Sequence, residues 1–229
     1  MLHPFGQDIW LADGPALVAT LGFHYPTRMA VIRLAGNQLL LWSPIAYSDA
    51  LRQEVETLGE ITHLVAPNAL HHVHIGDWKK ACPDARIWAA PGLDRKRPDL
   101  DIAGQLTETP PPDWGDQIAL ALYRGNAITT EAVLFHRPSG TALFTDLLQQ
   151  MPRDWFTGWR RVIARLDLMT QDEPTVPRKF RLGFTNRKAA RAARDIVRSW
   201  PVSAVVMAHG KPVTQDAKAY LDRAFAWLD

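Results

Sequence analysis

Cysteine is nearly absent from this sequence. Cys82 is the only cysteine among 229 residues, which excludes an internal disulfide and any zinc site built from several thiolates. Cysteines without disulfide partners are typical of a reducing compartment. We therefore expect a cytoplasmic protein.

Long apolar runs and strong charge of one sign are also missing. No stretch approaches the roughly 18 uninterrupted apolar residues of a membrane span. The first residues, from Met1 to Gly6, lack the basic start and apolar run of a signal peptide. The net charge is only +2, so the chain as a whole is not drawn to nucleic acid or anionic membranes. We expect neither as a partner.

The residues that are abundant indicate a packed globular protein. Hydrophobic residues make up 47% of the chain, and nine are tryptophan, enough for a sizeable core. Strand-like runs at 29–34, 38–42, 117–123 and 131–137 alternate with helical patterns, including 187–200. This order predicts an α/β protein with sheets inside and helices outside. With no convincing boundary along the chain, we expect a single domain spanning residues 1–229.

Three apolar runs each lead into a candidate metal ligand. Residues 61–66 precede the segment 68–74, which contains His71, His72 and His74. The run 141–145 leads to Asp146, and the run 204–208 leads to His209. Polar ligands at strand ends are typical of α/β reaction sites, because the sheet is rigid and the loops stay in contact with water. Imidazole and carboxylate are ligands for first-row metals.

These motifs resemble the metallo-β-lactamase superfamily. Its His-x-His-x-Asp-His signature is matched in part by Asn68-Ala69-Leu70-His71-His72-Val73-His74, its bridging Asp by Phe144-Thr145-Asp146, and its final ligand by Ala208-His209-Gly210. The resemblance implies an αββα four-layer sandwich.

A closer resemblance is to the DUF4336 branch of that superfamily. Trp42-Ser43-Pro44, Ala66-Pro67-Asn68 and Ala90-Pro91-Gly92 are similar to its motifs, and the similarity covers most of the chain.

The chain departs from the superfamily pattern at three ligand positions. Ala69 replaces the first His, Val73 replaces the signature Asp, and Asn126 replaces a His after Gly125. A complete site holds two metals, whereas the remaining ligands imply one divalent ion, with zinc preferred and iron or manganese as alternatives. The preferred ligands are His74, Asp146 and His209. His71 or His72 would be a fourth ligand or would orient the others, and Asp146 and His71 are also the candidate catalytic residues.

Three further residues are candidates for substrate binding. Arg28 precedes an apolar strand and could reach a carboxylate or phosphate, although a structural ion pair is the favoured explanation. Asn126 could bind water or substrate, or could only form a turn after Gly125. His72 would lie on the opposite face of an extended backbone from His71.

Two functions remain open at this stage. The first is hydrolysis of a small-molecule ester, amide or phosphoester by a metal-bound hydroxide, with a helical lid from the segment 147–181 that uses Trp155, Phe156 and Trp159. The alternative is a catalytically degenerate, metal-poor member of the superfamily that binds a ligand or partner. The sequence is also compatible with an oligomer.

The segment from Arg153 to Arg198 is strongly basic. It contains twelve Lys or Arg and five Asp or Glu. Four arginines, Arg187, Arg191, Arg194 and Arg198, share one helical stripe. We interpret the stripe as a solvated helix face opposite the apolar one; nucleic-acid binding is the alternative.

Overall fold

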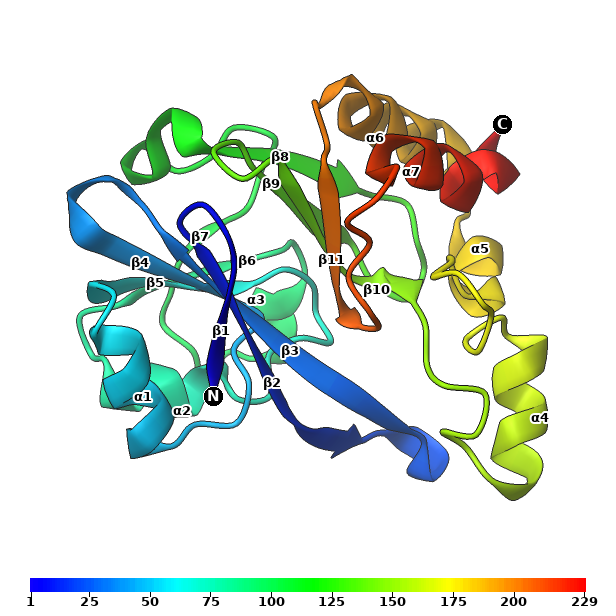
Figure 1. Ribbon diagram of the computed structural model, residues 1–229, viewed down its shortest axis with the longest axis horizontal. Coiled ribbons are helices and arrows are strands. Elements are labelled where there is room, and N and C mark those ends of the chain that lie inside the picture. Colours follow the sequence, from blue (N-terminus) through cyan, green and yellow to red (C-terminus); the bar gives the residue numbers. More distant parts are fainter.

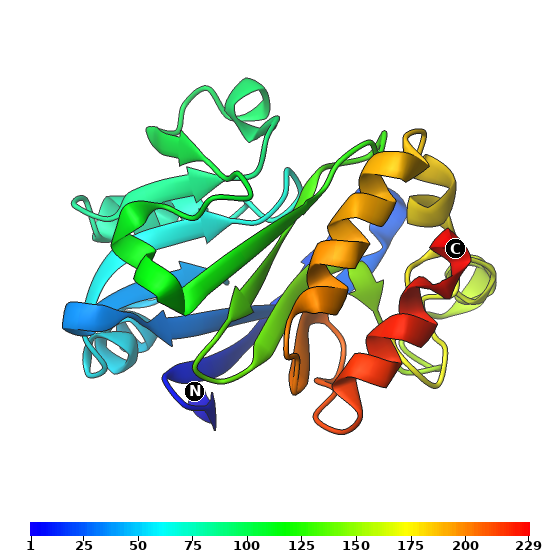
Figure 2. The ribbon, with the colours of Figure 1, turned by 90° about the horizontal axis from the view of Figure 1, so that it is seen from above.

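The computed structural model describes residues 1–229, and its centre is a pair of β-sheets (Figures 1 and 2). The larger sheet has seven strands in chain order. Its first four strands are antiparallel, and β4 to β7 are parallel. The strands are β1 (Leu2–Gly6), β2 (Ile9–Val18), β3 (His24–Arg33), β4 (Gln38–Trp42), β5 (Glu60–Ala66), β6 (Arg86–Ala89) and β7 (Ile102–Gln105).

The smaller sheet carries two of the predicted ligands on neighbouring strands. Its order is β11-β10-β9-β8, and only β10 and β11 are parallel to each other. The strands are β8 (Ile118–Tyr123), β9 (Glu131–His136), β10 (Thr141–Gln149) and β11 (Ala204–His209). The run that carries Asp146 does not end at that residue as predicted, because β10 continues to Gln149.

Helices cover the outer face of each sheet. The larger sheet is covered by α1 (Asp49–Glu56), α2 (Ile75–Ala81) and α3 (Leu93–Lys96). The smaller sheet is covered by α6 (Arg187–Ser199) and α7 (Ala217–Phe225), while α4 (Gly158–Leu166) and α5 (Arg178–Gly183) lie beside it (Figure 1). Four short 3-10 helices span Thr20–Gly22, Ala35–Asn37, Pro112–Gln117 and Ala226–Leu228.

Apolar side chains fill three layers between these elements. The central layer joins the facing sides of both sheets, with Leu40 and Trp42 from the larger and Leu134 and Leu143 from the smaller. A second layer lies between the larger sheet and its helices, and a third lies under α6 and α7. The fold is therefore the αββα sandwich predicted from the sequence.

The arginine stripe on α6 is less solvated than predicted. Arg194 is 8% exposed and pairs with Asp195 and Asp229. Arg198 pairs with Asp222, and the Arg191 guanidinium donates to a backbone carbonyl. Three of the four arginines thus hold α6 against the C-terminal segment, and their charge is largely compensated.

No helix of the structure combines the length and the apolar composition that crossing a membrane requires.

Candidate metal centre

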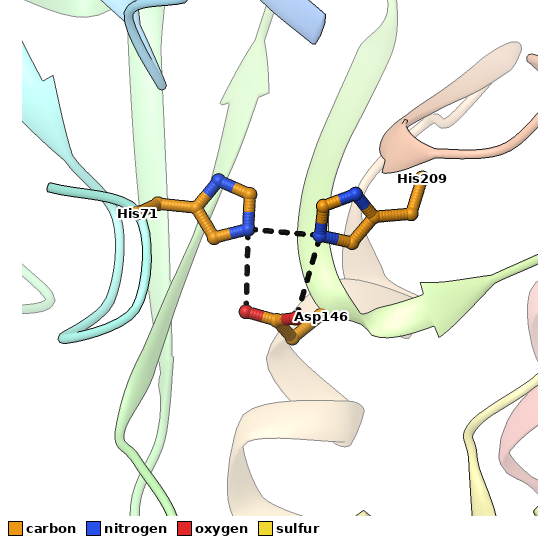
Figure 3. A group of neighbouring side chains, drawn as sticks. All are labelled: His71, Asp146 and His209. Atoms are coloured by element: carbon orange, nitrogen blue, oxygen red, sulfur yellow. Dashed lines mark hydrogen bonds and ion pairs between the residues drawn. The ribbon is translucent and has the colours of Figure 1, made fainter. Parts of the chain in front are cut away.

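The side chains of His71, Asp146 and His209 point toward one another (Figure 3). The His71 Nε2 lies 3.1 Å from the His209 Nε2 and 3.3 Å from the Asp146 Oδ2. The His209 Nε2 lies 3.5 Å from the Asp146 Oδ1. Ligand atoms about 2.0–2.1 Å from a tetrahedral zinc ion lie about 3.3 Å from one another. The three side chains therefore have the spacing of a metal-ligand set.

Hydrogen bonds on the far side of each imidazole leave the Nε2 atoms free to bind. The His209 Nδ1 is 2.6 Å from the Pro26 carbonyl oxygen, which only accepts, so Nδ1 carries a hydrogen and Nε2 is the ring nitrogen directed toward His71 and Asp146. The His71 Nδ1 is 2.8 Å from the Ser43 hydroxyl, which accepts or donates as the tautomer requires. Fixing the tautomer through the outer ring nitrogen is how proteins orient histidine ligands.

The Asp146 carboxylate is buried and held from two sides. The side-chain amides of Asn68 and Gln149 donate to its two oxygens, at 2.8 and 3.2 Å. Burial opposes ionisation, but His71 and His209 outweigh it and hold the pKa of Asp146 well below its usual range. Burial lowers the pKa of His71, against the raising effect of Asp146. At neutral pH the set therefore offers a carboxylate and a neutral imidazole, as a divalent metal requires.

Glu131 holds the backbone around Asp146, and it was not among the residues predicted from the sequence. Its carboxylate accepts from the backbone amides of Thr145, Asp146 and Leu147, and the Asn68 amide lies 3.3 Å from it. Burial, together with the charge of Asp146, raises the pKa of Glu131 to about 7. An acidic residue at the start of a buried apolar strand was the only signal for it.

The ligand set opens into a cavity of about 490 Å³. Apolar side chains from the tip of β2, from the segment after β5 and from α5 form much of its wall, together with Tyr25 and two lysines, Lys96 and Lys179. The Tyr25 ring lies 5.3 Å from the His209 ring, and the Lys179 Nζ donates to the Tyr25 hydroxyl at 3.2 Å. A metal at this position would keep an open side toward a small molecule.

His74 lies outside the ligand set, although the sequence favoured it over His71. It precedes α2 and lines the cavity, but is not part of the group of approaching ligand atoms. The physical reason is the turn after β5. The Asn68 side chain accepts from the backbone amides of Leu70 and His71, which bends the chain and directs His71 inward. The alternation expected of an extended backbone therefore does not apply.

The three substrate-binding candidates lie in different surroundings. His72 lines the cavity, beside the Arg97 guanidinium at 3.1 Å. Arg28 pairs with Asp13 at 2.7 Å and donates to the carbonyls of Met207 and Gly210, so it holds the chain on either side of His209. Asn126 bridges Phe180 and Ile128 through its side chain. Arg28 and Asn126 do not line this cavity.

The segment proposed as a lid contributes little to the cavity. Of residues 147–181, only Lys179 and Phe180 line it. Trp155 and Phe156 pack near His24, and Trp159 is 52% exposed. The three aromatic residues therefore do not shield the ligand set.

Ser43 is predicted to tune this site without binding a metal itself. We expect Ser43→Ala to weaken metal binding by about 10- to 100-fold, since it removes the partner that orients His71. Competition with a chromogenic chelator measures the affinity, and Ser48→Ala, at the cap of α1, is the matched control. An unchanged affinity for the Ser43 variant would show that His71 is oriented by its packing alone.

Solved structures with the same fold are metallo-β-lactamases and related proteins. A metallo-β-lactamase from Hirschia baltica is 15% identical with a TM-score of 0.63, covering all of this chain and 97% of that one. The FIM-1 enzyme of Pseudomonas aeruginosa, in a mono-zinc form, is 11% identical with a TM-score of 0.68, covering 100% and 94%. The metal-soaked flavodiiron core of Flv1 from Synechocystis is 11% identical with a TM-score of 0.66, covering 100% and 60%. These likenesses establish the fold.

The sequence comparisons give the family. No functionally curated protein shows significant similarity to the chain. The family model described as a domain of unknown function, DUF4336, matches residues 7–157. That range contains most of the larger sheet, His71 and Asp146, and the whole chain has the metallo-β-lactamase fold. The chain therefore belongs to the DUF4336 family and has the metallo-β-lactamase fold.

Proposed function

We propose that this protein is a metal-dependent hydrolase that holds one divalent ion with His71, Asp146 and His209. The observation that carries the proposal is the approach of their three ligand atoms to within 4.8 Å of one another, beside an open cavity. Zinc is the preferred ion, because two imidazoles and a carboxylate suit it, with iron or manganese as alternatives. The small-molecule substrate and the cytoplasmic location belong to the same proposal.

A single ion is favoured because the ligands for a second are missing. Ala69, Val73 and Asn126 replace three of the superfamily ligands. The Asn68 amide donates to the Asp146 Oδ2, so a donor occupies one side of the carboxylate that would bridge two metals. We therefore propose a mononuclear centre.

The residues around the centre suit hydrolysis of an ester, amide or phosphoester. A bound divalent ion would supply Lewis acidity and lower the pKa of a coordinated water toward about 7. Asp146 and His71 would fix the ion and its open side, and the apolar wall of the cavity would limit access of bulk water. Lys179, close to Tyr25, would favour negative charge on the reacting group.

The alternative function is ligand or partner binding without turnover. It is favoured by the missing signature Asp, because no carboxylate other than Asp146 lines the cavity. Nothing comparable would orient the attacking water.

Metal analysis combined with two simple substrates separates these functions. Protein purified without chelator is expected to contain about one zinc, iron or manganese per chain, and to hydrolyse 4-nitrophenyl acetate or bis(4-nitrophenyl) phosphate. Removing the metal with chelator should abolish hydrolysis, and returning it should restore the rate. Metal without turnover would favour the binding function. A metal-free protein whose melting temperature does not respond to zinc would contradict the metal site itself.

A further inference from the structure

Helix α4 turns its apolar stripe toward solvent. Trp159, Val162, Ile163 and Leu166 recur at the spacing of one helix face, and their exposed fractions are 52, 58, 45 and 57%. Ala164 is the only buried residue of the helix. Most amphipathic helices direct such a stripe to the core, and an exposed one indicates an interaction surface.

The tip of the β2–β3 hairpin extends the same apolar surface. Val18 and Leu21 are 71 and 70% exposed. The Arg160 guanidinium donates to the Leu21 carbonyl at 2.7 Å, and the Phe23 ring lies 5.7 Å from the Trp159 ring. Figure 1 shows α4 and this tip at the outer edge of the molecule. We call Val18, Leu21, Trp159, Val162, Ile163 and Leu166 the α4 surface.

Helix α4 places basic residues beside the α4 surface. Helix α4 contains three arginines and no acidic residue. Arg161 and Arg165 are exposed, form no ion pair or side-chain hydrogen bond, and line a hollow of about 570 Å³ together with Arg153. Of these three, only Arg153 is paired, with Asp172. On a helical wheel Arg160 and Arg165 border the apolar stripe on either side, and Arg161 lies further round the helix next to Arg165. A complementary partner is therefore apolar in the middle and anionic around it.

We propose that the α4 surface binds the surface of an anionic lipid bilayer, with α4 lying in the plane of the interface. Trp, Val, Ile and Leu side chains would enter the boundary of the acyl chains, and the flanking arginines would reach the lipid phosphates. The net charge of +2 led to the expectation of no membrane partner. That value is a sum over the whole chain, so it does not show the local basic patch on α4. Peripheral binding also needs no membrane-spanning helix.

Docking in this orientation would bring the cavity close to the lipid. Val18 belongs to the α4 surface and also lines the cavity that contains His71 and His209. The proposal does not depend on the metal, because none of the α4 residues contacts the ligand set.

Co-sedimentation with vesicles tests the proposal on the full-length protein. Vesicles of phosphatidylcholine with one quarter phosphatidylglycerol are compared with vesicles of phosphatidylcholine alone. We expect binding to the anionic vesicles, weakened roughly fivefold for each of Arg161→Gln and Arg165→Gln. The double variant Val162→Ser/Leu166→Ser should bind more than about tenfold more weakly. These side chains are exposed, so the fold should be retained, which circular dichroism checks.

Matched substitutions on α6 serve as controls. Ile196→Ser and Arg187→Gln remove exposed residues of the same types and should leave vesicle binding and metal content unchanged. The proposal would be overturned by a lack of binding to anionic vesicles at low ionic strength, or by equal binding of the Val162/Leu166 double variant. Self-association that this variant abolishes, without vesicle binding, would also overturn it and would assign the α4 surface to a second copy of the chain.

Discussion

Replacing His209 with alanine is expected to reduce the bound metal from about one ion to below about 0.1 per chain after dialysis. His71→Ala should have the same effect, because each change removes one of three protein ligands. The affinity should fall by more than about 100-fold, since even the residues that only orient ligands contribute 10- to 100-fold. Inductively coupled plasma mass spectrometry of the dialysed proteins measures the metal content.

His74→Ala is the matched control for these two variants. His74 lies in the same segment and lines the same cavity as His71, but outside the ligand set, so its loss should leave the metal content near that of the wild type. The opposite pattern, with metal lost in His74→Ala and kept in His71→Ala, would assign the ion to His74, Asp146 and His209. Melting temperatures measured in chelator separate lost ligands from lost folding.

The buried carboxylate of Glu131 is expected to make the metal-free protein less stable as the pH rises. Its pKa is 4.5 in the reference state and about 7 in the folded protein, so between these values the folded state binds more protons than the unfolded state. The stability that this group contributes is thus fully present below pH 4.5 and is lost as the pH rises to about 7. Over that window the loss is roughly 3 kcal/mol.

Urea unfolding in chelator, compared between the wild type and Glu131→Gln, isolates this effect. Glutamine does not titrate. The unfolding free energy of the wild type should therefore fall by roughly 3 kcal/mol relative to that of Glu131→Gln between pH 4.5 and 7.5. Glu60→Gln, at an exposed position of β5, controls for the loss of one charge. A difference that stays constant with pH would mean that Glu131 ionises as it does in water.

Local patterns predicted the elements around the site well. The strand at Gln38–Trp42 has the predicted ends, and the helix predicted at 187–200 is present at Arg187–Ser199. These elements follow from short-range physics: the spacing of apolar residues, turn residues such as Gly36, and caps formed within the same segment. The layered order of sheets and helices could then be read from the sequence of elements.

The same patterns did not show what each apolar helix face packs against. The stripe on α4 has the spacing of an inward face, yet it faces solvent. Arg194, predicted to be solvated, is buried against the C-terminal segment. Periodicity shows which side of a helix is apolar. The packing of distant segments decides whether that side is covered, and by which residues.

The sequence by itself indicated sheets covered by helices, and its family resemblance implied the αββα sandwich with Asp146 and His209 as candidate ligands next to apolar runs. Only the tertiary structure decided that His71 rather than His74 approaches them, that Arg28 supports the chain around His209, and that Glu131 holds the backbone under Asp146. The positions of Arg28 and Glu131 depend on hydrogen bonds to other strands, such as those to the Met207 carbonyl and from the Thr145 amide. A further bond joins Asn68, in the turn that carries His71, to Asp146. Contacts of that kind have no signal in local spacing, because they form only when separate strands and the two sheets have come together.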